Sequence, residues 1–252
     1  VAISRPRFGL RGLGGLDAAL LRRFADVLDA VLDAYGEVFA FEEWSKVPGK
    51  KLRVKVHLEK KVEKRTALAP HFAPELPFHS EIDFPVADAG AFKSPTPDGR
   101  FLFYGLCHEL GHVIAMWGDG KLEEDFHAWA HYTGVAVVEH LSEKAKDLPA
   151  LMGLADVRWR SLAIERGRLK SQKPSLADRE GVLALIIALH DTFGAKAIGA
   201  AINHLDRQDR RRRIQRVRYY TFKELKEALL ETLKSPEEKR RAAGVFSEAA
   251  KK

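Results

Sequence analysis

The chain has 252 residues, of which 46% are hydrophobic, so it is long enough to bury the core of one large domain or of two lobes that share a cleft. Its longest apolar run, VLALIIAL at 182–189, is too short to cross a bilayer, which excludes a membrane span in this sequence. The single cysteine excludes an intramolecular disulfide and a four-cysteine zinc site, and the net charge of +7 permits an anionic partner without requiring one.

The amino-terminal part of the chain is predicted to mix helix and strand. Residues 17–36 place apolar side chains at three- and four-residue spacings, the pattern of an amphipathic helix. In KLRVKVHLEKK, apolar residues alternate from Leu52 to Leu58, which predicts a strand with one buried face. A second strand is expected at Ile82–Val86, and Pro85 favours a sheet edge because proline has no N–H to donate.

The rest of the chain is predicted to be helical. After a turn-rich loop, helices are expected at about 101–117, 122–142, 147–168, 176–205 with a break near Gly194, and 221–234. SLAD at 175–178 and TFKE at 221–224 match the capping-box pattern of a hydroxyl followed by a carboxylate. The tail SEAAKK is expected to fray.

These elements predict an α+β fold. Residues 1–117 would form a small mixed α/β lobe, and residues 118–252 a helical lobe, together making one catalytic domain. The sequence begins at Val1 rather than at methionine, which leaves room for the prior removal of an upstream segment such as a signal peptide. The compartment does not follow from these residues.

A histidine-rich segment lies where the two predicted lobes meet. Four of the ten histidines fall between 107 and 131, and His108, Glu109 and His112 form an H-E-x-x-H motif. Positions four apart lie on the same helix face, so both imidazoles can bind one ion. Glu109 would project beside the ion, where it can accept a proton from a metal-bound water.

The alternative to a metal site is a motif that arose by chance in a polar helix. The surrounding sequence argues against it, because FLFYGLC and VIAMW on either side indicate a buried helix. A carboxylate and two imidazoles buried there without partners would cost several kcal/mol, roughly 2–7 for each unpaired polar group. A bound cation removes that cost, so we interpret the motif as a zinc site.

A catalytic zinc usually takes three protein ligands and leaves one position for water. Glu124 is the predicted third ligand, because it lies in the first turn of the next helix and the GDGK link lets the two helices fold back on each other. His127 and His131 are the competitors, since they share nearly the same helix face. Either could instead donate a hydrogen bond to the oxyanion, or simply be a hydrogen-bonded core histidine.

These residues resemble the gluzincin zinc metallopeptidases, the family of thermolysin and of aminopeptidase N. HELGH carries the resemblance, LEEDFHAW is similar to the second-helix pattern of the family, and the helical segments at 179–202 and 219–233 are similar in rhythm to its carboxy-terminal part. The resemblance covers about 101–233 and is strong at 104–132. It implies a two-lobed zincin-like fold, zinc bound by His108, His112 and Glu124, Glu109 as the general base, and a peptide substrate added beside the 81–86 strand.

The sequence also departs from that family. Only eleven residues separate His112 from Glu124, fewer than in the aminopeptidase branch, and the G-x-M-E-N signature of the exopeptidases is absent. The tyrosine expected before the glycine-led helix is replaced by ADREG at 177–181. The residues that could substitute for it stay open: Tyr104, Tyr132, Tyr219, Tyr220 and His131.

Two functions from different classes follow. The first is a zinc-dependent peptidase, most simply an endopeptidase, that hydrolyses peptide or protein substrates with Glu109 as the base. The second is a nucleic-acid-associated binding or regulatory protein on a similar scaffold, because the run from Arg207 to Arg218 holds seven arginines. Aromatic residues that would stack on bases are missing within that run, which favours the peptidase.

Overall fold

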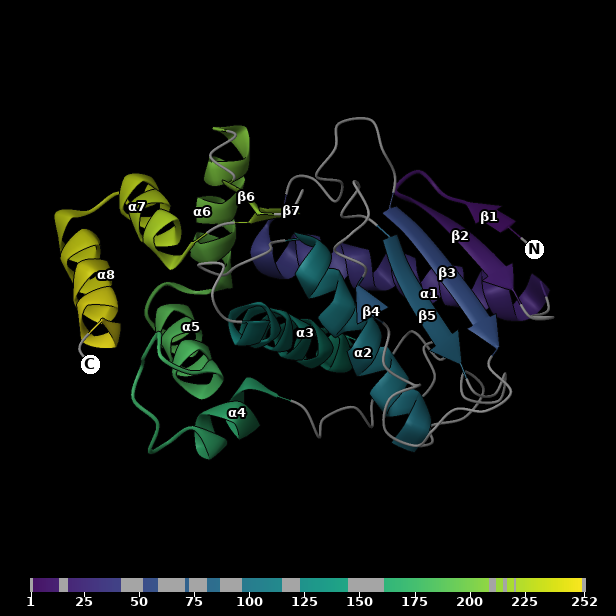
Figure 1. The fold of residues 1–252 in the computed structure, drawn as a ribbon, viewed down its shortest axis with the longest axis horizontal. Helices are drawn as coiled ribbons and strands as arrows, with labels where there is room; N and C mark the ends of the chain where they lie inside the picture. Colours follow the sequence, from purple (N-terminus) through teal and green to yellow (C-terminus); the bar gives the residue numbers. More distant parts are fainter. Residues whose placement is uncertain are drawn as a thin grey trace.

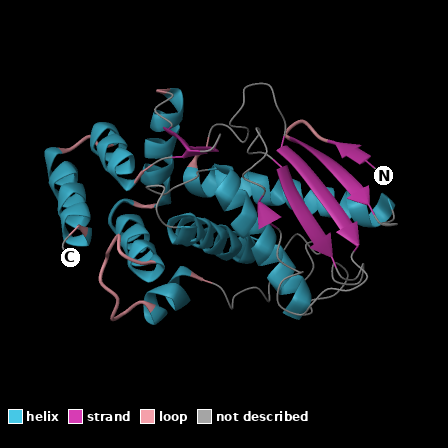
Figure 2. Cartoon of the chain, viewed as in Figure 1, coloured by secondary structure: helices cyan, strands magenta, loops and turns pink. Residues whose placement is uncertain are grey.

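The computed structural model describes residues 2–13, 18–41, 52–58, 71–72, 81–86, 97–114, 123–144, 161–208, 212–214, 217–219 and 221–250. The larger sheet lies at the end of the molecule that holds the amino terminus, with helices beside it, and the other end is mostly helical (Figure 2). The described residues thus combine many helices with a mixed sheet, which confirms the α+β class at that level. The predicted lobe boundary at 117/118 lies outside the described residues.

One five-stranded mixed sheet is present, in the order β1-β2-β3-β5-β4 (Figure 1). Its strands are β1 (Ala2–Ser4), β2 (Phe8–Leu13), β3 (Leu52–Leu58), β4 (His71–Phe72) and β5 (Glu81–Val86). The three central strands β2, β3 and β5 are parallel, whereas the outer strands β1 and β4 run antiparallel to their neighbours. Both β4 and β5 contact helix α2 (Pro97–Ile114), which carries the H-E-x-x-H motif.

The prediction that the 81–86 strand lies at the sheet edge is wrong. β5 pairs with β3 along its whole length, and β4 covers its other side. Pro85 is tolerated because β4 is only two residues long and pairs with Ile82 and Asp83 alone. Within the described strands, the β4 side of Phe84, Pro85 and Val86 therefore has no strand partner, so the missing N–H of Pro85 leaves no gap in a ladder there.

The helices follow the predicted pattern in most places. Beyond α2, they are α1 (Ala18–Phe39), α3 (Glu123–Lys144), α4 (Leu162–Arg168), α5 (Arg179–Phe193), α6 (Ala195–Arg207), α7 (Phe222–Thr232) and α8 (Pro236–Ala249). The predicted break at Gly194 is confirmed: its φ of 80° ends α5. Helix α8 was not predicted; it starts at Ser235 with a capping box and Pro236 at its first turn.

The two predicted caps have different outcomes. Thr221 and Glu224 form the expected capping box at the start of α7. At α5, however, the cap is Asp178 itself, whose side chain accepts a hydrogen bond from the N–H of Gly181. Ser175 lies outside the helix, where its hydroxyl accepts from the N–H of Ala177. The hydroxyl of SLAD therefore forms a local turn, and the carboxylate is the cap.

Helix α1 is bound to the first hairpin of the sheet by ion pairs and to the helical part by its apolar stripe. Arg7 contacts Asp29 at 2.9 Å and Asp33 at 2.7 Å, and Arg5 contacts Asp26 at 2.8 Å. These carboxylates lie three and four residues apart on one helix face, so the two arginines can reach them together. The opposite stripe is buried in a core shared with α3, α5 and α6.

The end of α1 packs against the backbone of α6 with no room for a side chain. A Cβ built on Gly199 would lie 1.6 Å from the carbonyl oxygen of Phe39. We expect Gly199→Ala to lower the free energy of unfolding by about 3 kcal/mol, because the two helices must separate. Gly36→Ala is the control, since open space surrounds that helical position, and it should be neutral or stabilising by up to about 1 kcal/mol. Equal urea midpoints for the two variants would contradict the packing described.

Two further features bear on partners. Among the described helices, none by itself is long and apolar enough to cross a membrane; α5 and α6 meet those criteria only jointly, and they are bent by 107°. Part of the arginine run forms a short antiparallel hairpin of β6 (Arg212–Ile214) and β7 (Val217–Tyr219). The side chains of the hairpin are outside the described residues, so nucleic-acid binding stays a prediction.

Candidate metal centre

Helices α2 and α3 cross at unusually close range. A Cβ on Gly111 would lie 2.2 Å from the hydroxyl oxygen of Thr133 and 2.9 Å from the Cα of Ala130. A Cβ on Gly134 would lie 3.1 Å from the backbone of His108. One glycine on each helix therefore lets the two backbones approach, and this brings side chains of α3 next to the H-E-x-x-H face of α2.

The back of this crossing is fixed by Tyr35 of α1. Its hydroxyl donates a hydrogen bond of 2.5 Å to the carbonyl oxygen of Cys107 and lies 3.3 Å from the hydroxyl oxygen of Thr133. Tyr35 is completely buried, among stacked and edge-on rings that include Phe39, Trp129 and Tyr132. A single buried side chain thus contacts both helices of the crossing, and the aromatic core around it holds them in register.

Three histidines converge on the other side of the crossing. The Nε2 atom of His108 lies 3.2 Å from Nε2 of His112 and 3.5 Å from Nδ1 of His127. One ligand nitrogen from each of the three rings lies within 4.8 Å of the other two. His112 is buried, whereas His108 and His127 are half-buried, so the cluster is reachable from solvent. These three side chains can hold a metal ion.

The spacing of the nitrogens suits a zinc ion. Two nitrogens that bind one zinc at about 2.0–2.1 Å with tetrahedral angles lie about 3.3 Å apart, close to the 3.2 Å and 3.5 Å found here. Hydrogen bonds among the rings explain the cluster less well, because Nε2 of His108 faces two ring nitrogens and a single N–H can be donated along only one direction. A shared cation satisfies all three lone pairs at once.

Metal ligation also requires neutral imidazoles. Burial lowers the pKa of His108 well below its usual value, and the charges of His112, His127, His131 and Arg179 lower it further. Burial, with smaller contributions from His127 and Arg179, lowers the pKa of His112 to about 3. Both rings are therefore unprotonated at neutral pH, with lone pairs available to an ion.

Glu109 follows the first histidine of the motif and is buried, with 7% of its surface exposed. Burial raises its pKa to about 8, and no cation among the described residues opposes that shift. A carboxyl group in such surroundings binds a proton more strongly than an exposed one does. At neutral pH such a group is mostly protonated, but a dication held by the neighbouring histidines would favour its ionised form, the form in which it can act as a general base.

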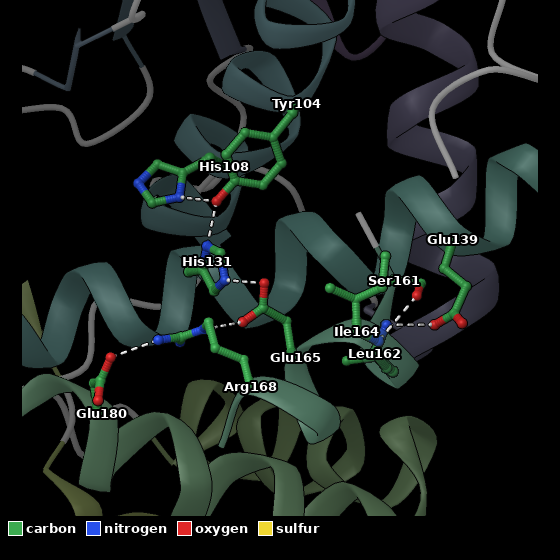
Figure 3. Close-up of polar contacts among 10 residues, drawn as sticks. All are labelled: Tyr104, His108, His131, Glu139, Ser161, Leu162, Ile164, Glu165, Arg168 and Glu180. Carbon is green, nitrogen blue, oxygen red and sulfur yellow. Dashed lines mark hydrogen bonds and ion pairs between the residues drawn. The ribbon is translucent and has the colours of Figure 1, made fainter. Parts of the chain in front are cut away.

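A chain of polar contacts leads away from the cluster on α2 and α3 to two further helices, α4 and α5 (Figure 3). The hydroxyl of Tyr104 lies 3.4 Å from Nδ1 of His108 and also contacts Nδ1 of His131. Nε2 of His131 lies 3.1 Å from a carboxylate oxygen of Glu165 in α4. The other oxygen of Glu165 accepts a 2.9 Å hydrogen bond from Arg168, which reaches Glu180 at the start of α5.

The structure brings together part of the predicted ligand set. His108 and His112 converge as expected, and the third described ligand nitrogen comes from His127, which the sequence offered as a competitor. Glu124 lies in the first turn of α3, but its side chain is outside the described residues, so its role as a ligand stays a prediction. His131 is held by Tyr104 and Glu165, away from the three nitrogens.

The tyrosines named as candidates for the missing family tyrosine also differ in where the structure places them. Tyr104 contacts two histidines, but Tyr132 is buried and its hydroxyl is 2.8 Å from Nδ1 of His190. The side chain of Tyr219 and all of Tyr220 are outside the described residues. The sequence analysis did not identify Glu165 or Arg168. It also did not predict the contact of Tyr104 with His108, although the four-residue spacing of these two residues in one helix is a signal for that contact.

Comparison of the chain with models of protein families, with curated proteins and with solved structures finds no match in any of the three. The function must therefore be inferred from the residues of the site themselves.

Proposed function

We propose that the protein is a zinc-dependent peptidase whose ion is bound by His108, His112 and His127. The observation that supports this most strongly is the convergence of three imidazoles, with nitrogen separations of 3.2 Å and 3.5 Å that suit zinc. A buried carboxylate, Glu109, lies next to them in the sequence. Three histidines leave one of four tetrahedral positions for water, as in catalytic rather than structural zinc sites.

Glu109 is the proposed general base. Zinc in such a site lowers the pKa of its water and polarises a carbonyl group of the substrate. Glu109 accepts the proton of the attacking water and later returns it to the leaving amine. It can do so because no ion pair with a described residue occupies its carboxylate.

The resemblance to gluzincins supports peptides as the substrate class. In the proposed zincin-like arrangement, the sheet lies beside the metal-binding helix, and the contacts of β4 and β5 with α2 agree with that. The stretch of β5 at Phe84–Val86, which has no partner on its β4 side among the described strands, is the proposed place for an extended peptide to pair. A peptide inhibitor bound far from this stretch would refute the pairing.

The choice between His127 and Glu124 as third ligand is tested by zinc content. We expect His127→Ala to lose the ion and Glu124→Ala to keep it, because removing one of three ligands weakens a zinc site far more than removing a neighbour does. Zinc measured by mass spectrometry after dialysis against a weak chelator reports both variants. The reverse pattern would make Glu124 the ligand.

Activity is tested on unfolded casein. The purified protein should cleave it, lose activity on treatment with a strong chelator and regain it when zinc is added back. The same assay at rising salt separates the peptidase from a nucleic-acid-binding protein, because phosphate contacts weaken steeply with ionic strength while hydrolysis at a buried ion changes little. Zinc-loaded protein that leaves casein intact would overturn the proposed activity on unfolded protein.

A further inference from the structure

The contacts of Tyr104, His131 and Glu165 with one another and with His108 have no part in the reaction proposed above. We propose that these three side chains are positioning residues, which hold the imidazole of His108 in its metal-binding orientation and strengthen its bond to the ion. This inference rests on the proposed metal site. It implies that buried side chains which do not bind the ion still affect the affinity of the site for it.

The chain begins at the nitrogen of His108 that does not face the cluster. Nε2 of His108 is directed at the other histidines. When Nε2 binds a metal, the single N–H hydrogen of the neutral His108 ring must therefore lie on Nδ1. The hydroxyl oxygen of Tyr104 lies 3.4 Å from Nδ1 of His108. Tyr104 can accept that hydrogen, which selects the tautomer with a free lone pair on Nε2.

The remaining contacts continue in the same donor direction. After accepting from His108, the hydroxyl of Tyr104 donates its own hydrogen to Nδ1 of His131. His131 then carries its hydrogen on Nε2, which lies 3.1 Å from the carboxylate of Glu165. With this assignment of hydrogens, each contact needs only one; the contact of His131 with Glu165 is at ion-pair distance and outside hydrogen-bond geometry.

Glu165 is an anion at the end of this chain. Burial alone would raise its pKa, but the interactions with His131 and Arg168 outweigh burial and hold it at about 2. Only 3% of its surface is exposed, so its charge is poorly screened by water. A charge in that position polarises the hydrogen bonds towards itself, which makes the far nitrogen of His108 a better electron donor.

The series of polar contacts from His108 to Glu180 also connects four helices around the site. Tyr104 and His108 belong to α2, His131 to α3 and Glu165 to α4, while Arg168 connects Glu165 to Glu180 of α5 (Figure 3). Tyr104 and His131 are each 7% exposed. An orienting group with so little freedom fixes the angle of the His108 ring, which metal binding requires.

Two pairs of variants test the inference against a merely structural role. Tyr104→Phe removes the hydroxyl of the chain, and Tyr132→Phe removes another buried hydroxyl that contacts His190 at 2.8 Å. Glu165→Gln removes the charge of the chain, and Glu224→Gln removes a buried carboxylate of the α7 capping box. Melting temperatures of the metal-free proteins establish that each variant is folded.

The readouts are the zinc dissociation constant, measured by competition with a fluorescent chelator, and the absorption spectrum of bound Co²⁺. We expect Tyr104→Phe and Glu165→Gln to bind zinc roughly ten- to a hundredfold more weakly and to shift the Co²⁺ bands. Both control variants should match the wild type. Unchanged zinc affinity in folded Tyr104→Phe and Glu165→Gln, or equal losses in the controls, would overturn the inference.

These results stay distinct from the outcome for the proposed activity. Wild-type protein that binds zinc without hydrolysing casein would refute the peptidase, while a weaker affinity confined to the two chain variants would still support the positioning role. Wild-type protein that binds no zinc would overturn both.

Discussion

Glu109→Gln is expected to reduce hydrolysis by a factor of about a hundred or more while leaving the zinc content unchanged. Glutamine has nearly the same shape as glutamate but cannot accept a proton, and general-base catalysis contributes roughly 10²–10⁴-fold to a rate. Glu109 is not among the three clustered nitrogen ligands, so the ion should stay. The measurement is kcat/KM on a peptide substrate together with zinc analysis of the same sample.

Three histidine variants serve as controls for that result. His108→Ala and His112→Ala should lose both zinc and activity, because each removes a clustered nitrogen. His140→Ala should lose neither, since that histidine lies on the same helix as His127 but contacts Glu37 instead. Full activity in Glu109→Gln would remove the proposed base, and loss of zinc in that variant would show that Glu109 helps to hold the ion.

Gly111→Ala is expected to damage the proposed metal site without touching any of the three clustered histidines. The added Cβ would lie 2.2 Å from the hydroxyl of Thr133 and 2.9 Å from the Cα of Ala130, and the backbone atom cannot move aside by a rotamer change. Helix α3 must therefore shift, and His127 shifts with it. We expect a loss of about 2–3 kcal/mol in the free energy of unfolding and at least a tenfold weaker zinc affinity.

The matched control for this variant is Gly244→Ala in α8, where an added Cβ would have open space around it. Alanine is the better helix former, so this variant should be at least as stable as the wild type and should bind zinc normally. Urea denaturation and chelator competition report both quantities. Gly111→Ala that binds zinc as tightly as Gly244→Ala would mean that the close crossing of α2 and α3 does not set the ligand geometry.

The sequence was most informative where one helix decides the outcome. His108 and His112 lie four residues apart, so helix geometry alone places them on one face, and that prediction is confirmed by their 3.2 Å contact. The capping box at Thr221 and the break at Gly194 are likewise local. In each case, the physics acts within a few residues of the chain.

Predictions that depend on how two elements meet were less successful. Which residue of α3 faces α2 depends on the crossing, and the crossing depends on Gly111 fitting against Thr133 and Ala130. Periodicity places Glu124, His127 and His131 near one helix face. Glu124 was predicted from its place in the first turn, and that prediction stays untested because its side chain is outside the described residues. The order of the sheet strands raises the same difficulty, since β3 pairs with β5 rather than with β4, the next described strand in the chain.

The contacts around Glu165 could not be predicted from the sequence at all. This carboxylate lies 34 positions beyond His131 and on another helix, and its burial follows only once α4 packs against α3. In a single sequence it has the same appearance as the many exposed glutamates. Only the fold distinguishes Glu165, which is buried between His131 and Arg168, from an exposed glutamate.

X-ray absorption at the zinc edge of the zinc-loaded protein tests the central claim most directly. Three imidazoles in the site predict multiple-scattering features of histidine and a first shell of four light atoms at about 2.0–2.1 Å. Those features should persist in Glu124→Ala, whereas His127→Ala is expected to take up no zinc and to give no such spectrum. A spectrum without imidazole scattering, or a protein that takes up no zinc, would contradict the account.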